Sequence, residues 1–424
     1  MRTIISLLLL VSTTLFDINH AAWTAGTALL AVALLLLPNL RAIAASITGR
    51  FALAQTFFAV LFVFWHGLPD EHALVSGMRF VGVASFLLCM PLYASLFKAS
   101  GIDRMLLGLI GQVRKGLQIP TLLACAVAST FGLSFGTIPL YGTPMPPRSG
   151  PATAALARGV VISMLLAPTT GSVAAVMAAF PGLTLPAILA ATLPMALAAF
   201  GLACLFGHGG IEISHEENSD AELDLKPMAI VVASMVALSF AGMPLLPAIA
   251  WTGVIAHLIW PVERNGFSSG IAVIRRTWDE SSLRLAPEIL LFVATGWLSW
   301  ALSGLDFSLS GAALFSQDAR FMLPGLVLAS MSVLAMAGVH PMVAFGLLRP
   351  FTDKIGMGLP PVGEYTVWLI GFILALLVAP VSVLTTISAA TSGLSPWQAS
   401  IRLHGFYALA LGATTIAYIA FRFQ

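Results

Sequence analysis

The chain has 424 residues, of which 58% are hydrophobic and 9% are charged, and its mean hydropathy is +0.96. Soluble domains carry about 25% charged residues, so this composition excludes a soluble multidomain protein and predicts an all-α polytopic protein in a lipid bilayer. The formal net charge of +2 excludes the basic surface that a nucleic-acid partner needs. The 3 cysteines lie in apolar runs without metal-ligand spacing, so the sequence predicts no disulfide, metal site or cofactor.

The apolar runs bounded by charge, Pro or Gly predict about eleven membrane spans, because a bilayer core takes about 20 apolar residues per helix. Residues 1–21 are interpreted as an uncleaved leading helix, and a signal peptide cleaved near Ala21 is the alternative. Lys and Arg cluster in residues 98–115 and 264–284, which predicts that these loops are cytoplasmic. The spans cover residues 4–16, 22–37, 51–65, 73–97, 153–180, 185–206, 228–243, 245–260, 289–302, 365–392 and 401–421.

Two further apolar stretches, at about residues 118–143 and 321–349, are interrupted by Gly and Pro and are rich in hydroxyl groups. Backbone that leaves the helix at membrane depth is tolerated only where it is buried in protein or lines a watery cavity. Both stretches are therefore predicted to be re-entrant hairpins. A pair of proline-kinked spanning helices is the alternative.

The two halves of the chain carry the same short motifs, most of them containing Gly or Pro, in the same order, which indicates an internal duplication. We divide the chain into repeat 1 (22–206), a cytoplasmic loop (207–227) and repeat 2 (228–424). Each repeat contains an odd number of crossings, so equivalent helices are expected to run in opposite directions, as inverted repeats do. The matches are Ser100-Gly101-Ile102-Asp103 with Ser303-Gly304-Leu305-Asp306, Ile119-Pro120 with Leu323-Pro324, Gly136 to Pro139 with Gly338 to Pro341, Pro146-Pro147 with Pro360-Pro361, Ala167-Pro168 with Ala379-Pro380, and Gly182-Leu183-Thr184 with Gly393-Leu394-Ser395.

Three spans, an interfacial arm, a hairpin, a broken helix and a last span, repeated in inverted orientation, resemble the ion transporter superfamily. Its members include divalent-anion/sodium symporters, arsenite and citrate permeases, and the large subunits of tripartite dicarboxylate transporters. The stretch SGIDRMLLGLIGQVRKGLQIPTLLACAVAST at residues 100–130 is similar to them in texture. The resemblance implies a secondary active transporter of a bacterial-type inner (plasma) membrane, which works by alternating access on a small anionic substrate, for which we favour an organic carboxylate. It also implies a homodimer.

Two alternatives to a self-sufficient transporter follow from the same sequence. One is a membrane subunit that needs a partner protein, as tripartite systems do, and uptake by the purified chain in liposomes separates the two. The other is an intramembrane enzyme, which we do not expect because the helices contain neither an HExxH pair nor a facing pair of aspartates.

The substrate site is expected where the hairpin tips meet the breaks in the helices that face them. Pro beside Ser or Thr predicts the breaks at residues 167–172 and 379–382, and hydroxyl groups donate to an anion without adding a charge. For a single hydroxyl, a bond back to its own helix is the simpler interpretation. The predicted substrate-binding residues are Ser134, Thr137, Thr169, Thr170, Ser172, His340, Ser382, Thr385 and Thr386, with Ser129, Thr130, Ser330 and Ser332 completing the lining.

His340 is the one ionisable residue in the repeated Gly-x-x-Pro elements. Imidazole titrates near neutral pH, so His340 is the candidate for proton coupling, and a hydrogen bond to a carbonyl freed by Pro341 is the alternative. Sodium coupling is less expected, because neither hairpin contains the asparagine of the Ser-Asn-Thr triplets that divalent-anion symporters carry. Arg79 and Arg158 are assigned to helix ends, where long cationic side chains reach toward water.

Overall fold

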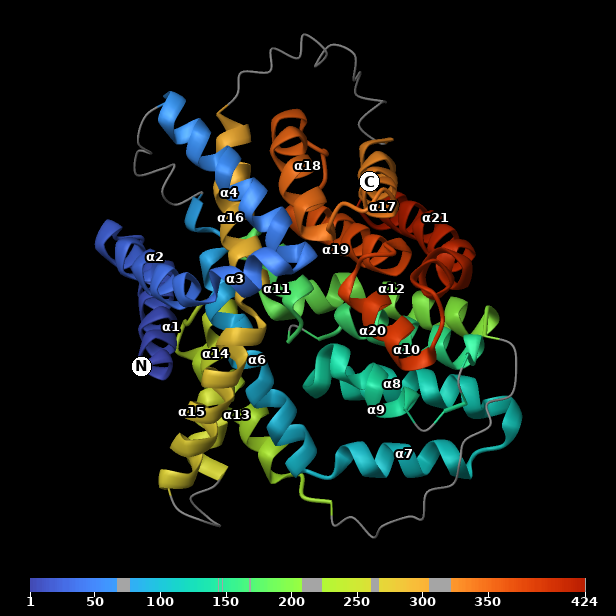
Figure 1. Cartoon of the computed structure of the whole chain (residues 1–424). Coiled ribbons are helices and arrows are strands. Elements are labelled where there is room, and N and C mark those ends of the chain that lie inside the picture. The colour runs from blue at the N-terminus through green and yellow to red at the C-terminus, as the bar shows by residue number, and fades with distance from the viewer. Residues whose placement is uncertain are drawn as a thin grey trace.

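The chain folds into helices, as the composition predicts (Figure 1). In the part that the structure describes there is no strand, and 9 helices are long and apolar enough to cross a membrane. The prediction of an all-α polytopic membrane protein is confirmed. The structure is a computed structural model that describes residues 1–66, 77–143, 145–146, 148–167, 169–207, 223–260, 267–304 and 322–423.

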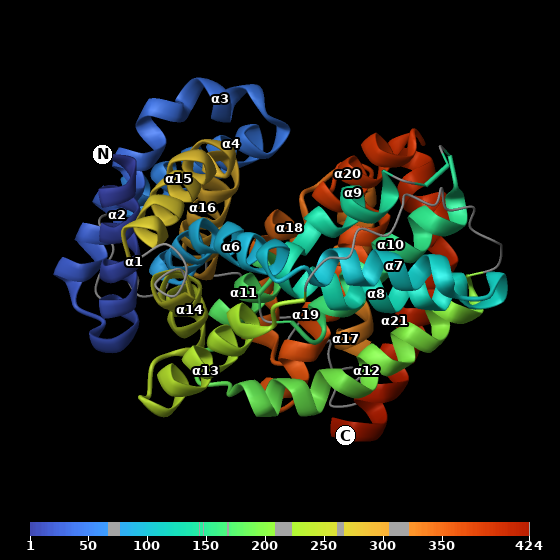
Figure 2. The ribbon, with the colours of Figure 1, turned by 90° about the horizontal axis from the view of Figure 1, so that it is seen from below.

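The helices form two bundles, which are seen side by side in Figure 2. Bundle 1 consists of α1 (Arg2–Asn19), α2 (Ala22–Leu36), α3 (Leu40–Ala45), α4 (Ile47–His66), α6 (Val81–Ala99), α13 (Lys226–Phe240), α14 (Leu245–Ile259), α15 (Phe267–Arg284) and α16 (Ala286–Ser303). Bundle 2 consists of α7 (Ile102–Gln112), α8 (Gln118–Leu133), α9 (Thr137–Gly142), α10 (Gly150–Met164), α11 (Gly171–Ala178), α12 (Leu185–Leu205), α17 (Leu323–Met336), α18 (Pro341–Ile355), α19 (Pro361–Val378), α20 (Val383–Ser392) and α21 (Leu403–Phe423).

Burial follows position within the bundles. Only 22% of the most apolar stretch of α4 is buried inside the protein, whereas 83% of the corresponding stretch of α19 and α20 is buried. A helix that is apolar on all sides and still exposed is suited to lipid, while α19 is enclosed by protein. Trp368 and Tyr365 of α19 are fully buried, so α19 lies in the core of bundle 2.

Helices that the predicted duplication pairs with each other make matching contacts. The first arm of each hairpin packs on the first part of a broken helix: α8 on α10, and α17 on α19. Equivalent helices also pack on each other, as α6 does on α16, α10 on α19, and α12 on α21. In Figure 1, α6 ends at the bottom of the molecule and α16 ends at the top. A twofold axis between inverted halves would produce this pattern.

The first hairpin folds back on itself at a short 3₁₀ turn, Ser134–Gly136, between α8 and α9. The hydroxyls of Ser129 and Tyr141 lie 2.5 Å apart. Twelve residues of continuous helix would separate them by about 18 Å, so the chain must reverse between them. In the second hairpin, the turn between α17 and α18 contains Gly338 with a positive φ of 92°.

Each of the two spans that were predicted to contain a break forms two separate helices. The predicted span 153–180 forms α10, which ends at Met164, and α11, which begins at Gly171. The predicted span 365–392 forms α19 and α20, separated between Val378 and Val383.

Two predicted spans form helices that are shorter than a bilayer core. Residues 228–243 and 245–260 form α13 and α14, which have 15 residues each. Each is about 22 Å long, less than the roughly 30 Å of a bilayer core. They pack as a helical hairpin, because Gly242 adopts a positive φ of 77° in the turn between them. Most of the predicted loop 207–227 and the arm around Asp306 lie outside the described residues.

Candidate substrate site at the hairpin tips and helix breaks

The first helix break joins the first hairpin tip. Thr169 Oγ1 donates a hydrogen bond of 2.8 Å to the carbonyl of Phe131, at the end of α8. Thr170, the residue before α11, is fully buried, and its hydroxyl has no hydrogen-bond partner among the described residues. Ser172 is buried in the first turn of α11. This break therefore presents a free hydroxyl at a helix N-terminus, where negative charge is favoured.

The tip of the first hairpin is held by its own hydroxyls. Thr130 Oγ1 lies 3.2 Å from Thr137 Oγ1, and both side chains are fully buried. Ser134 has a positive φ of 49°, which is uncommon for a residue other than glycine. Its hydroxyl is buried and has no hydrogen-bond partner within the described ranges. Backbone in such a conformation persists only where the surrounding structure holds it.

At the second break, the hydroxyls of Ser382 and Thr385 both have hydrogen-bond partners. Ser382 precedes α20, donates to the carbonyl of Leu376 at 2.8 Å, and accepts from the backbone N–H of Thr385 at 3.1 Å. Thr385 Oγ1 lies 3.0 Å from Ser382 Oγ. The bond back to the helix is therefore the observed role of Ser382. Thr386 is exposed.

The first hairpin also contacts the second broken helix. α20 packs on α9 and on the turn Ser134–Gly136. The backbone N–H of Arg148 donates to the carbonyl of Ser392 at 2.7 Å. A cavity of about 10 Å³, the size of one water molecule, lies between α9, α10 and α20, and Ser388 is among its lining residues. The hydroxyl of Ser388 is buried and has no partner in the described part of the chain.

His340 occupies the N-cap of α18 at the tip of the second hairpin. Its Nδ1 accepts a hydrogen bond of 3.2 Å from the backbone N–H of Met342, which requires the ring to be neutral at Nδ1. The imidazole thus accepts a hydrogen bond from the start of α18, whereas the alternative interpretation of His340 had it donate to a carbonyl freed by Pro341. Ser332 donates to the carbonyl of Leu328 in its own helix, and Ser330 is half-buried.

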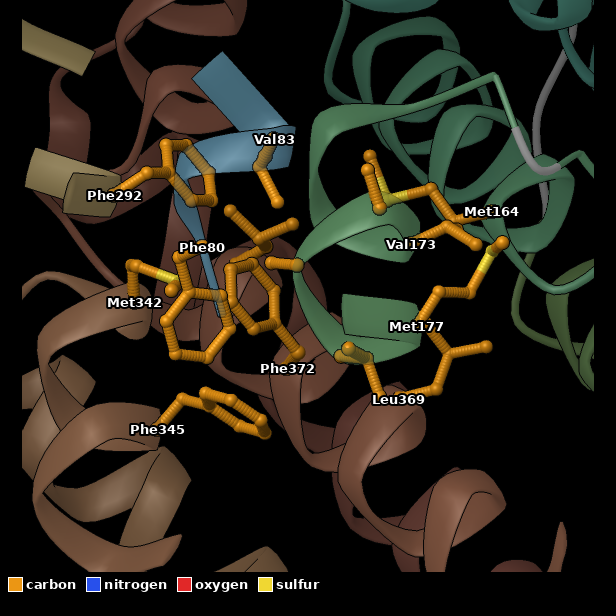
Figure 3. Close-up of a cluster of buried hydrophobic side chains, with 14 of the residues drawn as sticks. Phe80, Val83, Met164, Val173, Met177, Phe292, Met342, Phe345, Leu369 and Phe372 are labelled. Carbon is orange, nitrogen blue, oxygen red and sulfur yellow. The ribbon is translucent and has the colours of Figure 1, made fainter. Parts of the chain in front are cut away.

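An apolar cluster lies between the first break and the second hairpin (Figure 3). It fills the space between α11 and α18. The contacts described above bring together the first hairpin, the first break and α20, while His340 lies at the start of α18, which contributes to this cluster. Its members include Phe80, which precedes α6, Val83 of α6, Met164 at the end of α10, Val173 and Met177 of α11, Phe292 of α16, Met342 and Phe345 of α18, and Leu369 and Phe372 of α19.

Two arginines that the sequence did not place in a site are buried. Arg158 is 4% exposed in the interior of α10, so its assignment to a helix end is wrong. It donates to the carbonyl of Leu403 at 2.8 Å and lies 4.8 Å from the ring centroid of Tyr407. An ionisable residue inside an apolar span was itself the signal that could have found it.

Arg349 of α18 lies at the contact between the second hairpin and α19. Its Nε lies 2.8 Å from Asp353, in an ion pair without good hydrogen-bond geometry, and its Nη1 lies 3.8 Å from Glu364. Its guanidinium lies 4.2 Å from the ring centroid of Phe180, which follows α11. Arg349 thus connects the second hairpin to the end of the first broken helix through its contact with Phe180.

The described residues contain no group of three or more His, Cys, Asp or Glu side chains that could hold a metal ion. No protein-family model matches the chain, and no curated protein matches its sequence. Among solved structures, the chain is similar to the Alcanivorax borkumensis YdaH transporter, described as having an unusual topology. The TM-score is 0.55 at 14% sequence identity, and the match covers 88% of this chain and 98% of that one. This chain therefore has a fold similar to that of a membrane transporter.

Proposed function

We propose that this protein is a secondary active transporter that moves a small anionic solute, an organic carboxylate, across the inner (plasma) membrane by alternating access. The observation that carries the proposal is the pair of buried hydroxyls of Thr170 and Ser134, which have no partner among the described residues. They come from a helix break and a hairpin tip that a hydrogen bond joins. Buried polar groups are rarely left without a partner, so such groups mark a place where a ligand or water binds.

The chemistry of this site suits an anion. Hydroxyl and backbone N–H donors surround the N-terminus of α11, whose helix dipole favours negative charge. Two interrupted helices beside hairpin tips are the arrangement in which transporters bind solutes at the membrane midplane.

The proposal includes membership of the ion transporter superfamily, two inverted repeats and a homodimer. The similarity to a YdaH transporter supports a transport function. The opposite directions of α6 and α16 in Figure 1 support the inversion.

We further propose that transport is coupled to protons through His340. A proton on Nδ1 would break the bond to Met342 and place positive charge at a helix N-terminus, where the dipole opposes it. Protonation would therefore loosen the second hairpin tip unless an anion offsets the charge. This links proton binding to substrate binding.

The test is uptake by the purified chain in liposomes. A thermal-shift screen of carboxylates and inorganic oxyanions first selects a ligand, because a ligand that binds only the folded state raises its apparent stability. Accumulation of that ligand under an imposed proton gradient, without any second protein, is the expected result. Uptake that requires an added partner protein would instead establish the tripartite alternative.

A further inference from the structure

A cavity of about 590 Å³ lies where bundle 1 meets the α11–α12 turn of bundle 2. Its volume is typical of pockets that hold an organic ligand. It is bounded by the end of α1, the start of α6, the α11–α12 turn and the α13–α14 turn. Its wall at Ala178 lies about 12 Å along α11 from Thr170, so it is separate from the helix break.

Two opposite charges line this cavity without pairing with each other. Arg79 precedes α6 and Asp17 lies near the end of α1, and both are half-buried. Within the described residues neither side chain has a hydrogen bond or an ion pair. The charged groups that act on Arg79 are Asp353, which attracts it, and Arg349, which repels it. Partly buried charges that make no hydrogen bond or close ion pair are costly, so a ligand that bonds to them would be favoured.

The dipoles of the two helix ends at this cavity favour the same ligand charges as the side chains of Arg79 and Asp17. The N-terminus of α6 lies beside Arg79, and both favour an anionic group. The C-terminus of α1 lies beside Asp17, and both favour a cationic group. Asp17 Oδ2 lies close over Gly82, where an added Cβ would come within 3.6 Å of it, so Asp17 is directed at the wall that α6 forms.

The surface between the two charges is apolar. Met78, Met177 and Phe180 line it from bundle 2 and from the start of α6, and Leu246 lines it from α14. An apolar wall with a few charged groups at its ends fixes the orientation of an amphipathic ligand.

We propose that this cavity is a second binding site, for a zwitterionic ligand whose anionic oxygens pair with Arg79, whose amine pairs with Asp17, and whose apolar body lies between them. A soluble amino-carboxylate such as a short peptide and an amine-bearing phospholipid headgroup share this chemistry. The inference is independent of the proposed transport function, because its test measures binding and not uptake.

The experiment uses one apolar dipeptide, Phe-Leu, in three forms: free, N-acetylated, and C-amidated. The free form carries both charges, and each blocked form keeps only one. Binding to the detergent-purified chain is measured by calorimetry, with the melting temperature of each variant as the check on folding. We expect the free dipeptide to bind at least tenfold more tightly than either blocked form.

The variants assign each charge to its residue. Arg79→Gln should weaken the free and acetylated forms equally, and Asp17→Asn should weaken the free and amidated forms equally. Ala178→Phe fills the cavity and should weaken all three, while Arg50→Gln, at an exposed arginine on α4, is the matched control and should change none. If Asp17→Asn tightens the acetylated form and leaves the free form unchanged, the site takes an anion and the zwitterion proposal is wrong.

A second measurement identifies the source of the ligand. In nanodiscs, phosphatidylethanolamine should displace the dipeptide, or bind in its place, if a lipid headgroup is the natural occupant. Nanodiscs of phosphatidylglycerol, which lacks the amine, should leave dipeptide binding intact. Failure of both the dipeptide and phosphatidylethanolamine to bind the folded protein overturns the proposal.

Discussion

Thr169 Oγ1 bonds to the carbonyl of Phe131, and this contact fastens the first helix break to the first hairpin tip. The same hairpin packs on the second broken helix through α9 and α20, and Arg148, which follows the hairpin, donates a backbone bond to Ser392. One hairpin thus holds both broken helices. A movement of this hairpin would change the surroundings of Thr170 and of Ser388 together.

Thr170→Val is expected to weaken substrate binding by about tenfold or more. Valine keeps the shape and removes the hydroxyl, and a hydrogen bond to a charged group contributes about 1.5–3 kcal/mol. The matched control is Thr192→Val, because Thr192 is equally buried but donates to the carbonyl of Ile188 in its own helix. Calorimetry with the ligand from the thermal-shift screen measures the effect. Equal affinities for both variants would remove Thr170 from the site.

Gly346→Ala is expected to destabilise the contact between the second hairpin and bundle 1. An added Cβ would come within 2.3 Å of Thr295 Cγ2, and overpacking of this kind costs about 1–3 kcal/mol. Thr295→Ser removes that methyl and keeps the hydroxyl that bonds to Gln55, so it should restore the stability of the double variant. Melting temperatures of the single and double variants test this. Additive losses would contradict the packing.

Arg349→Met is expected to lower the melting temperature and to loosen the second hairpin. Methionine keeps much of the apolar contact with Phe180 but leaves Glu364 and Asp353 without their cation. Breaking a buried pair costs about 3–5 kcal/mol, and the partial exposure of both acids reduces this to roughly 1–3 kcal/mol. Adding Glu364→Gln should recover part of the loss. A single variant as stable as the parent would show that the ion pairs contribute nothing.

Inversion of the repeats is tested by the ends of α6 and α16. In a background whose cysteines are replaced by alanine, Ala99→Cys and Ser303→Cys introduce single thiols at equivalent, exposed helix ends. A membrane-impermeant maleimide should label Ala99→Cys from the cytoplasm and Ser303→Cys from the other side. Labelling of both thiols from one side would exclude inversion.

Local sequence signals predicted the parts of this fold that local chemistry determines. Pro380 beside Ser382 marks a helix end and a cap, and the structure interrupts the helix between Val378 and Val383. Gly338 marks the reversal in the second hairpin, because a positive φ there favours glycine.

Contacts between distant segments could not be predicted in this way. Nothing near Arg349 in the sequence shows that Phe180 lies against it, since 168 residues lie between them. The sequence does not show that Arg158 is buried, because its distance from water depends on how α10 packs against α21. Its assignment to a helix end was therefore wrong. Ser388 was missed because its place in the small cavity depends on how α20 meets the first hairpin.

His340→Gln is expected to remove the pH dependence of transport. The glutamine carbonyl can still accept from the N–H of Met342, so the cap on α18 is kept while the titratable ring is lost. In the parent protein, acid would protonate Nδ1, break the cap and favour an anion at the second tip, so substrate binding should strengthen as pH falls through the titration of this imidazole. The variant should bind substrate with an affinity that no longer changes with pH, and a proton gradient should no longer drive its accumulation in liposomes. His340→Ala, which loses both the cap and the titration, serves as the comparison: it should also lower the melting temperature, as loss of a helix cap costs about 1 kcal/mol. Retention of gradient-driven accumulation by His340→Gln, or parent uptake that follows sodium and ignores pH, would show that His340 does not couple transport to protons.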